Sequence, residues 1–218
     1  MGRAVKTQPQ GQCAAAELAS PAIGQGKLGI TLRMYNYGVS RRLLSRAEGE
    51  ATAILQQAGI EAAWVDCPLT EAEWENYPAC QNAPGPTDFS VKILTTAKAD
   101  RFSSHHEALG QALECPRGQM GCSAYVFYRN VTALARDGDA GEYQLLGHAL
   151  AHEIGHLLLG PNSHSATGIM RGNWNHQDLQ SIARSYLFFT DQQSKQMRNE
   201  VSARDSNRPD QMTTAAKQ

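Results

Sequence analysis

The motif His-Glu-x-x-His at residues 152–156 constrains this chain more than any other feature of its sequence. It lies within residues 142–159, where leucine, isoleucine and alanine recur at the spacing of an amphipathic helix, so we predict a helix there. Side chains four residues apart project from the same face of an α-helix. His152 and His156 can therefore grip one metal ion, and Glu153 can reach a water bound to that ion.

These residue types predict a hydrolytic zinc centre with one ion. Zinc lowers the pKa of a bound water to about 7, and we expect Glu153 to accept its proton as a general base. A helix that merely packed two histidines and a glutamate among apolar residues would bury costly polar groups. His148 lies one turn before His152, and we expect it to support the site or lie at the surface rather than bind the ion.

The segment after the helix supplies a candidate third ligand. Gly160 can end the helix in a left-handed conformation, and Pro161 prevents its continuation. The chain must then turn back, so we expect His164 to approach the same ion. Residues 168–170 form a predicted tight turn, in which Met170 would provide an apolar floor for the site.

These residues resemble the metzincin clan of zinc peptidases, whose pattern H-E-x-x-H-x-x-G-x-x-H precedes a methionine-bearing turn. They look most like the matrix-metalloproteinase-type branch and its bacterial relatives. The resemblance spans about Gly147 to Trp174. It implies an α+β, zincin-like fold: a twisted mixed β-sheet with an active-site helix and a small C-terminal helical lobe. It further implies that His152, His156 and His164 bind zinc, that Glu153 is the catalytic base and that Met170 belongs to the Met-turn.

The spacing departs from that pattern. Gly160 follows His156 by four residues rather than three, and His164 follows Gly160 by four rather than three. This longer link keeps His176 and Asp178 open as alternative third ligands.

The resemblance also implies a substrate-binding strand. An edge strand above the zinc would pair with the extended backbone of a protein or peptide substrate. Its residues would be Leu109, Gly110, Gln111, Ala112 and Leu113. A specificity pocket beside His156 would be walled by residues such as Arg171 and Trp174.

Hydrophobic periodicity outlines the rest of the chain. We predict strands at about 28–35, 60–66, 91–95 and 122–129, and helices at about 41–58, 142–159 and 176–203. Residues 108–114 are ambiguous between a helix and an edge strand. We expect a flexible arm (1–26), one catalytic domain (27–204, with lobes at 27–160 and 161–204) and a flexible tail (205–218).

Five cysteines bear on the compartment. Cys67 with Cys80, and Cys115 with Cys122, each bracket a loop and could close a local disulfide, whereas Cys13 has no obvious mate. Reduced thiols are the alternative. The disulfides would place the protein outside a reducing cytosol, in an extracellular or periplasmic compartment, although the chain's start lacks a signal-peptide h-region.

Charge and hydropathy exclude several function classes. The formal net charge of -1 argues against nucleic-acid binding, and no apolar run approaches the length of a membrane span. We expect a monomeric endopeptidase. The competing interpretations are a non-catalytic zinc fold used for binding and a structural zinc site closed by a fourth ligand such as His148 or His176.

Overall fold

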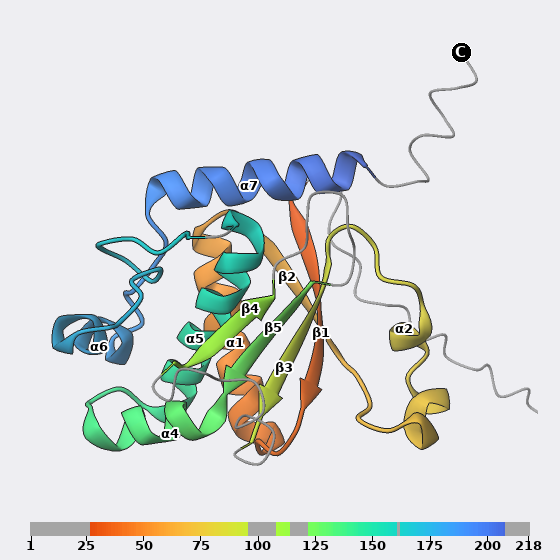
Figure 1. Cartoon of the computed structure of the whole chain (residues 1–218), viewed down its shortest axis with the longest axis horizontal. Helices are drawn as coiled ribbons and strands as arrows, with labels where there is room; N and C mark the ends of the chain where they lie inside the picture. The colour runs from red at the N-terminus through yellow and green to blue at the C-terminus, as the bar shows by residue number, and fades with distance from the viewer. Residues whose placement is uncertain (1–26, 96–107, 114–121, 161, 208–218) are drawn as a thin grey trace, which may run out of the picture.

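The computed structural model describes residues 27–95, 108–113, 122–160 and 162–207. Its elements in chain order are β1 (Gly29–Asn36), α1 (Arg41–Gln57), β2 (Glu61–Asp66), η1 (Glu71–Asn76), α2 (Pro78–Gln81), β3 (Asp88–Leu94), β4 (Gly110–Leu113), β5 (Ser123–Phe127), α4 (Tyr128–Asp137), α5 (Glu142–Leu159), α6 (His176–Ala183) and α7 (Asp191–Ser206). Figure 1 shows a single sheet with helices packed around it.

The sheet is mixed, with strand order β2-β1-β3-β5-β4. β1 pairs in parallel with β2 and β3, and β3 pairs in parallel with β5. β4 runs antiparallel to β5 and forms an edge of the sheet. Residues 110–113 of the ambiguous segment are therefore an edge strand, and strands are present, with shifted ends, at the other four predicted places.

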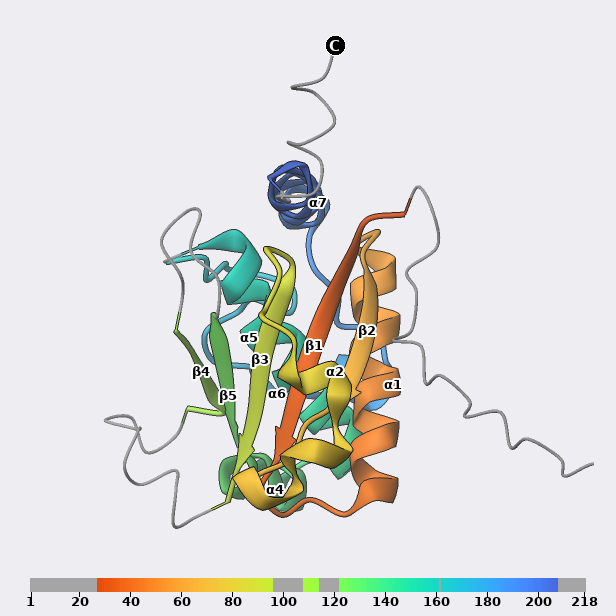
Figure 2. The same cartoon turned by 90° about the vertical axis from the view of Figure 1, so that its right-hand side faces the viewer.

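Two long helices, α1 and α5, cover one face of the sheet. Figure 2 shows them together behind the strands, with α2 on the opposite side. Ser40 caps α1, because its side chain accepts a hydrogen bond from the Leu43 amide. The helices approach closely at Gly147, where an added Cβ would lie 2.8 Å from the Ala47 carbonyl oxygen. This close packing fixes α5 against the rest of the core.

Helix α5 is the most deeply buried helix of the fold. Every residue from Leu145 to Leu158 except His156 is buried. A helix that is apolar on nearly all sides is stable only when other elements cover it. Helix α5 is covered by α1, β4, β5, α6 and α7. The predicted architecture of a mixed sheet, a central motif-bearing helix and a C-terminal helical segment is thus confirmed.

Two sequence predictions about helices are wrong. The strand predicted at 122–129 ends at Phe127, and the chain passes directly into the unpredicted helix α4, with Phe127 as its N-cap residue. The helix predicted at 176–203 is two helices, α6 and α7. Between them Ser185 has a positive φ of 55°, which breaks the helix.

The break after α6 redirects apolar side chains into the core. Leu187 and Phe189 are buried, whereas Tyr186 is 73% exposed. Thr190 then caps α7: its hydroxyl accepts from the Gln193 amide, and the Gln193 side chain accepts from the Thr190 amide. The break lets the side chains of Leu187 and Phe189 reach the core. Their burial explains why the predicted single helix is two helices.

The disulfide predicted between Cys67 and Cys80 is present, with an S–S distance of 2.03 Å, and it closes the loop that holds η1 and α2. Cys122 is also disulfide-bonded. Cys115 and Cys13 lie outside the described residues, as do His105 and His106. Among the helices that are described, none combines the length and apolar character needed to cross a bilayer.

Candidate metal centre

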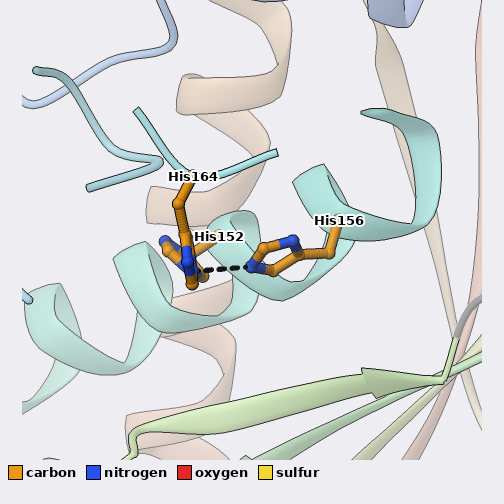
Figure 3. Close-up of side chains that lie close together, drawn as sticks. All are labelled: His152, His156 and His164. Carbon is orange, nitrogen blue, oxygen red and sulfur yellow. Dashed lines mark hydrogen bonds between the residues drawn. The ribbon is translucent and has the colours of Figure 1, made fainter. Parts of the chain in front are cut away.

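Three histidines converge on one point beside α5. His152 and His156 project from the same face of that helix, and His164 reaches them from the segment that follows it (Figure 3). The Nε2 atom of His156 lies 3.1 Å from the Nε2 atoms of both His152 and His164. One potential ligand atom from each ring lies within 4.8 Å of the other two.

The outer nitrogens of two rings are held by the same following segment. His152 Nδ1 lies 2.7 Å from the Ile169 carbonyl oxygen. A carbonyl can only accept a hydrogen bond, so this Nδ1 carries the proton and the His152 Nε2 presents a lone pair. His156 Nδ1 lies 2.8 Å from the Ser163 hydroxyl oxygen. The Ile169 carbonyl also accepts a hydrogen bond from Trp174 Nε1 at 3.0 Å.

Burial keeps these imidazoles neutral. It lowers the pKa of His152 to about 4, against the opposing effect of the Ile169 hydrogen bond, and the neighbouring His164 lowers it further. Burial likewise lowers the pKa of His156 to about 3, with His152 and His164 contributing in the same direction. Neutral rings offer the lone pairs that a metal ion requires.

The cluster fits a zinc ion. Nitrogen ligands about 2.0–2.1 Å from a tetrahedral zinc lie about 3.4 Å from one another, close to the two 3.1 Å separations that join the Nε2 atoms. Lone pairs directed at each other repel unless a cation or a proton lies between them. Exposure rises from buried His152 through half-buried His156 to exposed His164, so the cluster opens to solvent on the His164 side.

Glu153 directly follows His152 in α5, and its side chain faces the edge strand. Its side chain is 5% exposed, and burial raises the pKa of its carboxyl to about 8. A Cβ added at Gly110 would lie 2.6 Å from both Cγ and Oε1 of Glu153, and 2.5 Å from the Tyr125 carbonyl oxygen. The strand thus approaches the carboxylate through a residue without a side chain. A dication bound nearby would stabilise the ionised carboxylate and oppose the effect of burial.

Met170 packs against the motif helix at Gly155. It is fully buried, and a Cβ added at Gly155 would come within 2.6 Å of its sulfur and 2.7 Å of Phe189 Cε1. Gly155 directly precedes His156 in the motif, so this contact joins the motif to the C-terminal segment.

The structure does not bring the alternative ligands to the cluster. Asp178 Oδ2 accepts from the Asn175 amide and lies 3.0 Å from Arg171 Nε. His176 Nε2 contacts the Gln180 amide 3.1 Å away and is exposed. Within the described residues, the group able to hold a metal contains His152, His156 and His164.

His148 is neither a ligand nor a surface residue. It is fully buried, its Nδ1 donates to the Gln144 carbonyl oxygen at 2.8 Å, and burial lowers its pKa. The surface alternative for this residue is therefore wrong. Trp174 lies beside His152, with 5.9 Å between ring centroids, and so supports the first histidine of the motif.

Sequence reasoning missed two residues of this site. Ser163 and Ile169 hold the outer nitrogens of the two helical histidines, and neither belongs to the motif. A serine directly before the candidate third ligand was the available signal for Ser163. Ile169 acts through its backbone, which no side-chain pattern reveals.

No protein-family model and no curated protein matches this chain. Its own fold and site define the class: an α+β protein whose buried central helix presents a histidine cluster able to hold a metal. A solved structure similar to it is archaemetzincin from Methanopyrus kandleri, with 13% sequence identity and a TM-score of 0.45 over 83% of this chain and 99% of that chain. The comparisons do not support the matrix-metalloproteinase-type branch.

Proposed function

We propose that this protein is a zinc-dependent endopeptidase. The observation that carries the proposal is the convergence of three imidazole Nε2 atoms at the helix that also carries the buried carboxyl group of Glu153. His152, His156 and His164 would hold one zinc ion and leave a coordination position open toward solvent. When bound, zinc supplies a Lewis acid that acidifies water and polarises a carbonyl.

Glu153 is the proposed general base. It directly follows His152 in the helix, and its carboxylate is not a member of the histidine cluster. With a dication bound, the Glu153 carboxylate would be ionised at neutral pH, and it would accept a proton from the attacking water and deliver it to the leaving amine. The apolar surroundings that bury Glu153 keep bulk water from competing for that proton.

The edge strand β4 is the proposed binding site for the substrate backbone. It pairs with β5 on one side, and its residue Gly110 touches Glu153. Leu109 accepts from the Phe127 amide, so in the alternating antiparallel pattern the backbone groups of Gly110 and Ala112 point away from β5. Within the described residues no hydrogen-bond partner is seen for those groups, and we propose that they pair with an extended peptide.

Two further features support this assignment. Met170 and Gly155 are in contact beneath the histidines, which suits a Met-turn that keeps the site's floor apolar. The Cys67–Cys80 disulfide suits an oxidising compartment, so we place the protein outside the cytosol.

Glu153→Gln tests the mechanism. The variant should bind one zinc ion with wild-type affinity and lose at least about 100-fold in kcat/KM on a quenched-fluorescent peptide library, since general base catalysis is typically worth 10²–10⁴-fold. Glu142→Gln, the same substitution at the start of the same helix, is the matched control and should retain activity.

The same experiment separates the competing functions. A wild-type chain that binds zinc and cleaves no peptide would favour a non-catalytic binding fold. Equal turnover by wild type and Glu153→Gln would refute the assignment of the base. A zinc ion coordinated by four protein side chains would favour a structural site.

A further inference from the structure

The imidazole of His156 is held between two consecutive residues. Its Nδ1 atom lies 2.8 Å from Ser163 Oγ, and its Nε2 atom lies 3.1 Å from His164 Nε2. Opposite edges of one ring thus meet neighbouring positions of one short segment. Any change in the path of that segment would alter both contacts.

The link between His156 and Ser163 is built to return over the last turn of α5. Gly160 ends the helix with a φ of 83°, and its amide donates to the His156 carbonyl oxygen at 3.0 Å. Asn162 then adopts a left-handed φ of 56°. Asparagine tolerates this conformation better than most residues. The link therefore reverses within a few residues and brings Ser163 and His164 back to the ring.

The helical histidines differ in what holds their outer nitrogens. His152 relies on a backbone carbonyl, that of Ile169, which no substitution removes. His156 relies on the side chain of Ser163. A hydroxyl that accepts the Nδ1 proton fixes the tautomer and the plane of the ring, and so directs the Nε2 lone pair at the cluster. Without the hydroxyl, the ring can rotate about its bond to Cβ and the half-buried Nδ1 turns to water.

We propose that Ser163 is a positioning residue of the metal centre: its hydroxyl accepts the Nδ1–H of His156 and holds Nε2 toward His152 and His164. The inference rests on the zinc site of the proposed function, and it deepens that proposal because it concerns metal affinity rather than catalysis.

Three variants of the full-length chain test the role of Ser163. Ser163→Ala removes the hydroxyl, and Ser163→Thr retains it. Ser165→Ala is the matched control. Ser165 lies in the same segment as Ser163, but its hydroxyl bonds to Thr167 and to Gln193 of α7 rather than to a histidine. Zinc dissociation constants are measured by chelator competition. The visible absorption spectrum of each cobalt-substituted protein reports the ligand field.

Ser163→Ala should bind one zinc ion with about 10- to 100-fold weaker affinity, the usual effect of losing a partner of a ligating histidine, and should show a shifted cobalt spectrum. Ser163→Thr should restore both properties, and Ser165→Ala should match wild type. Unchanged affinity in Ser163→Ala, or an equal loss in Ser165→Ala, would overturn the inference.

Neither measurement requires a substrate, so the outcomes separate the two proposals. A wild-type protein that binds zinc and cleaves nothing would refute the endopeptidase while leaving the role of Ser163 to stand on its affinity data. A wild-type protein that takes up no zinc would overturn both.

Discussion

Gly110 on the edge strand lies directly against the carboxylate of Glu153. A Cβ at position 110 would lie 2.6 Å from Oε1 of Glu153 and 2.5 Å from a backbone oxygen of the partner strand. Contacts this short force a side chain or a strand to move. The position of the proposed base is therefore coupled to the edge strand through a residue that lacks a side chain.

Gly110→Ala should reduce kcat/KM by about 100-fold, because a displacement of about 1 Å at a catalytic group can cost that much. Zinc stoichiometry should stay at one, since none of the three atoms nearest to the added Cβ belongs to a histidine. Gly49→Ala is the control: nothing lies within 4 Å of its added Cβ in α1, and alanine there should raise the free energy of unfolding by about 0.5–1 kcal/mol. Wild-type turnover by Gly110→Ala would show that the contact does not position the base.

Ala112→Pro should weaken peptide cleavage and spare the sheet. The Ala112 amide points away from β5, so proline there removes a group offered to the substrate rather than a hydrogen bond of the sheet. We expect the effect mainly in KM, with zinc binding unchanged. Gln111→Pro, at a position paired with Tyr125, should instead lower thermal stability. Cleavage that is indifferent to Ala112→Pro would rule out pairing at this edge.

His164→Ala should lose zinc, whereas His176→Ala should keep it. His164 belongs to the cluster, and His176 contacts Gln180 instead. Loss of a ligand should weaken affinity by more than the 10- to 100-fold typical of losing a ligand's partner. Metal analysis after dialysis against a weak chelator measures both variants. Full zinc occupancy in His164→Ala would assign the third ligand elsewhere.

Gly155→Ala should destabilise the protein by about 1–3 kcal/mol, the usual range for overpacking a core. The added methyl group would meet Met170 Sδ at 2.6 Å and Phe189 Cε1 at 2.7 Å. Urea denaturation of the two single variants and of the double variant with Met170→Ala measures the coupling. A smaller penalty for the alanine in the Met170→Ala background is expected, because the shorter side chain leaves room; strictly additive changes would contradict contact with Met170.

Glu48 makes the folded state less stable as pH rises. Burial, and then the negative charge of Asp66, raises its pKa from the ordinary value of 4.5 to about 7. The folded state therefore holds this proton more tightly than the unfolded state, and the free energy of unfolding falls between about pH 4.5 and pH 7. Glu48→Gln has no charge to bury. It should match wild type at pH 4 and be more stable at pH 8 by about 1 kcal/mol after allowance for solvent screening.

Chemical denaturation of both proteins at the two pH values checks this expectation. Comparing the pair cancels the opposite effect of His148, whose burial lowers its pKa in both proteins. A stability difference that is the same at pH 4 and pH 8 would assign the effect to something other than the Glu48 proton.

The sequence predicted elements whose pattern is local. β1 and α1 follow from alternation, helical spacing and the Ser40 cap, and α5 follows from its long apolar face. Helix α4 was missed because no glycine or proline separates it from β5 and because asparagine, valine and threonine in its first turns are weak helix formers. The split of the last helix depends on where Leu187 and Phe189 find a core, which is a tertiary property.

The residues of the site likewise include some that a local pattern predicts and some that only tertiary contacts determine. The spacing of His152 and His156 is set by the helix itself, so their shared face could be predicted. The contact between Gly110 and Glu153 joins elements far apart in the chain, and the hydroxyl of Ser163 reaches His156 only through a left-handed Asn162. Such contacts depend on backbone conformations that the residue types permit without requiring.

The Ile169 carbonyl accepts from both His152 and Trp174, so the first histidine of the motif is oriented by backbone that lies 17 residues further along the chain. When only the sheet and α5 have left the ribosome, the chain contains both helical histidines but not yet Ile169, whose carbonyl orients the first of them. The cluster seen in the folded protein therefore requires the segment through Trp174 to be synthesised and packed against α5.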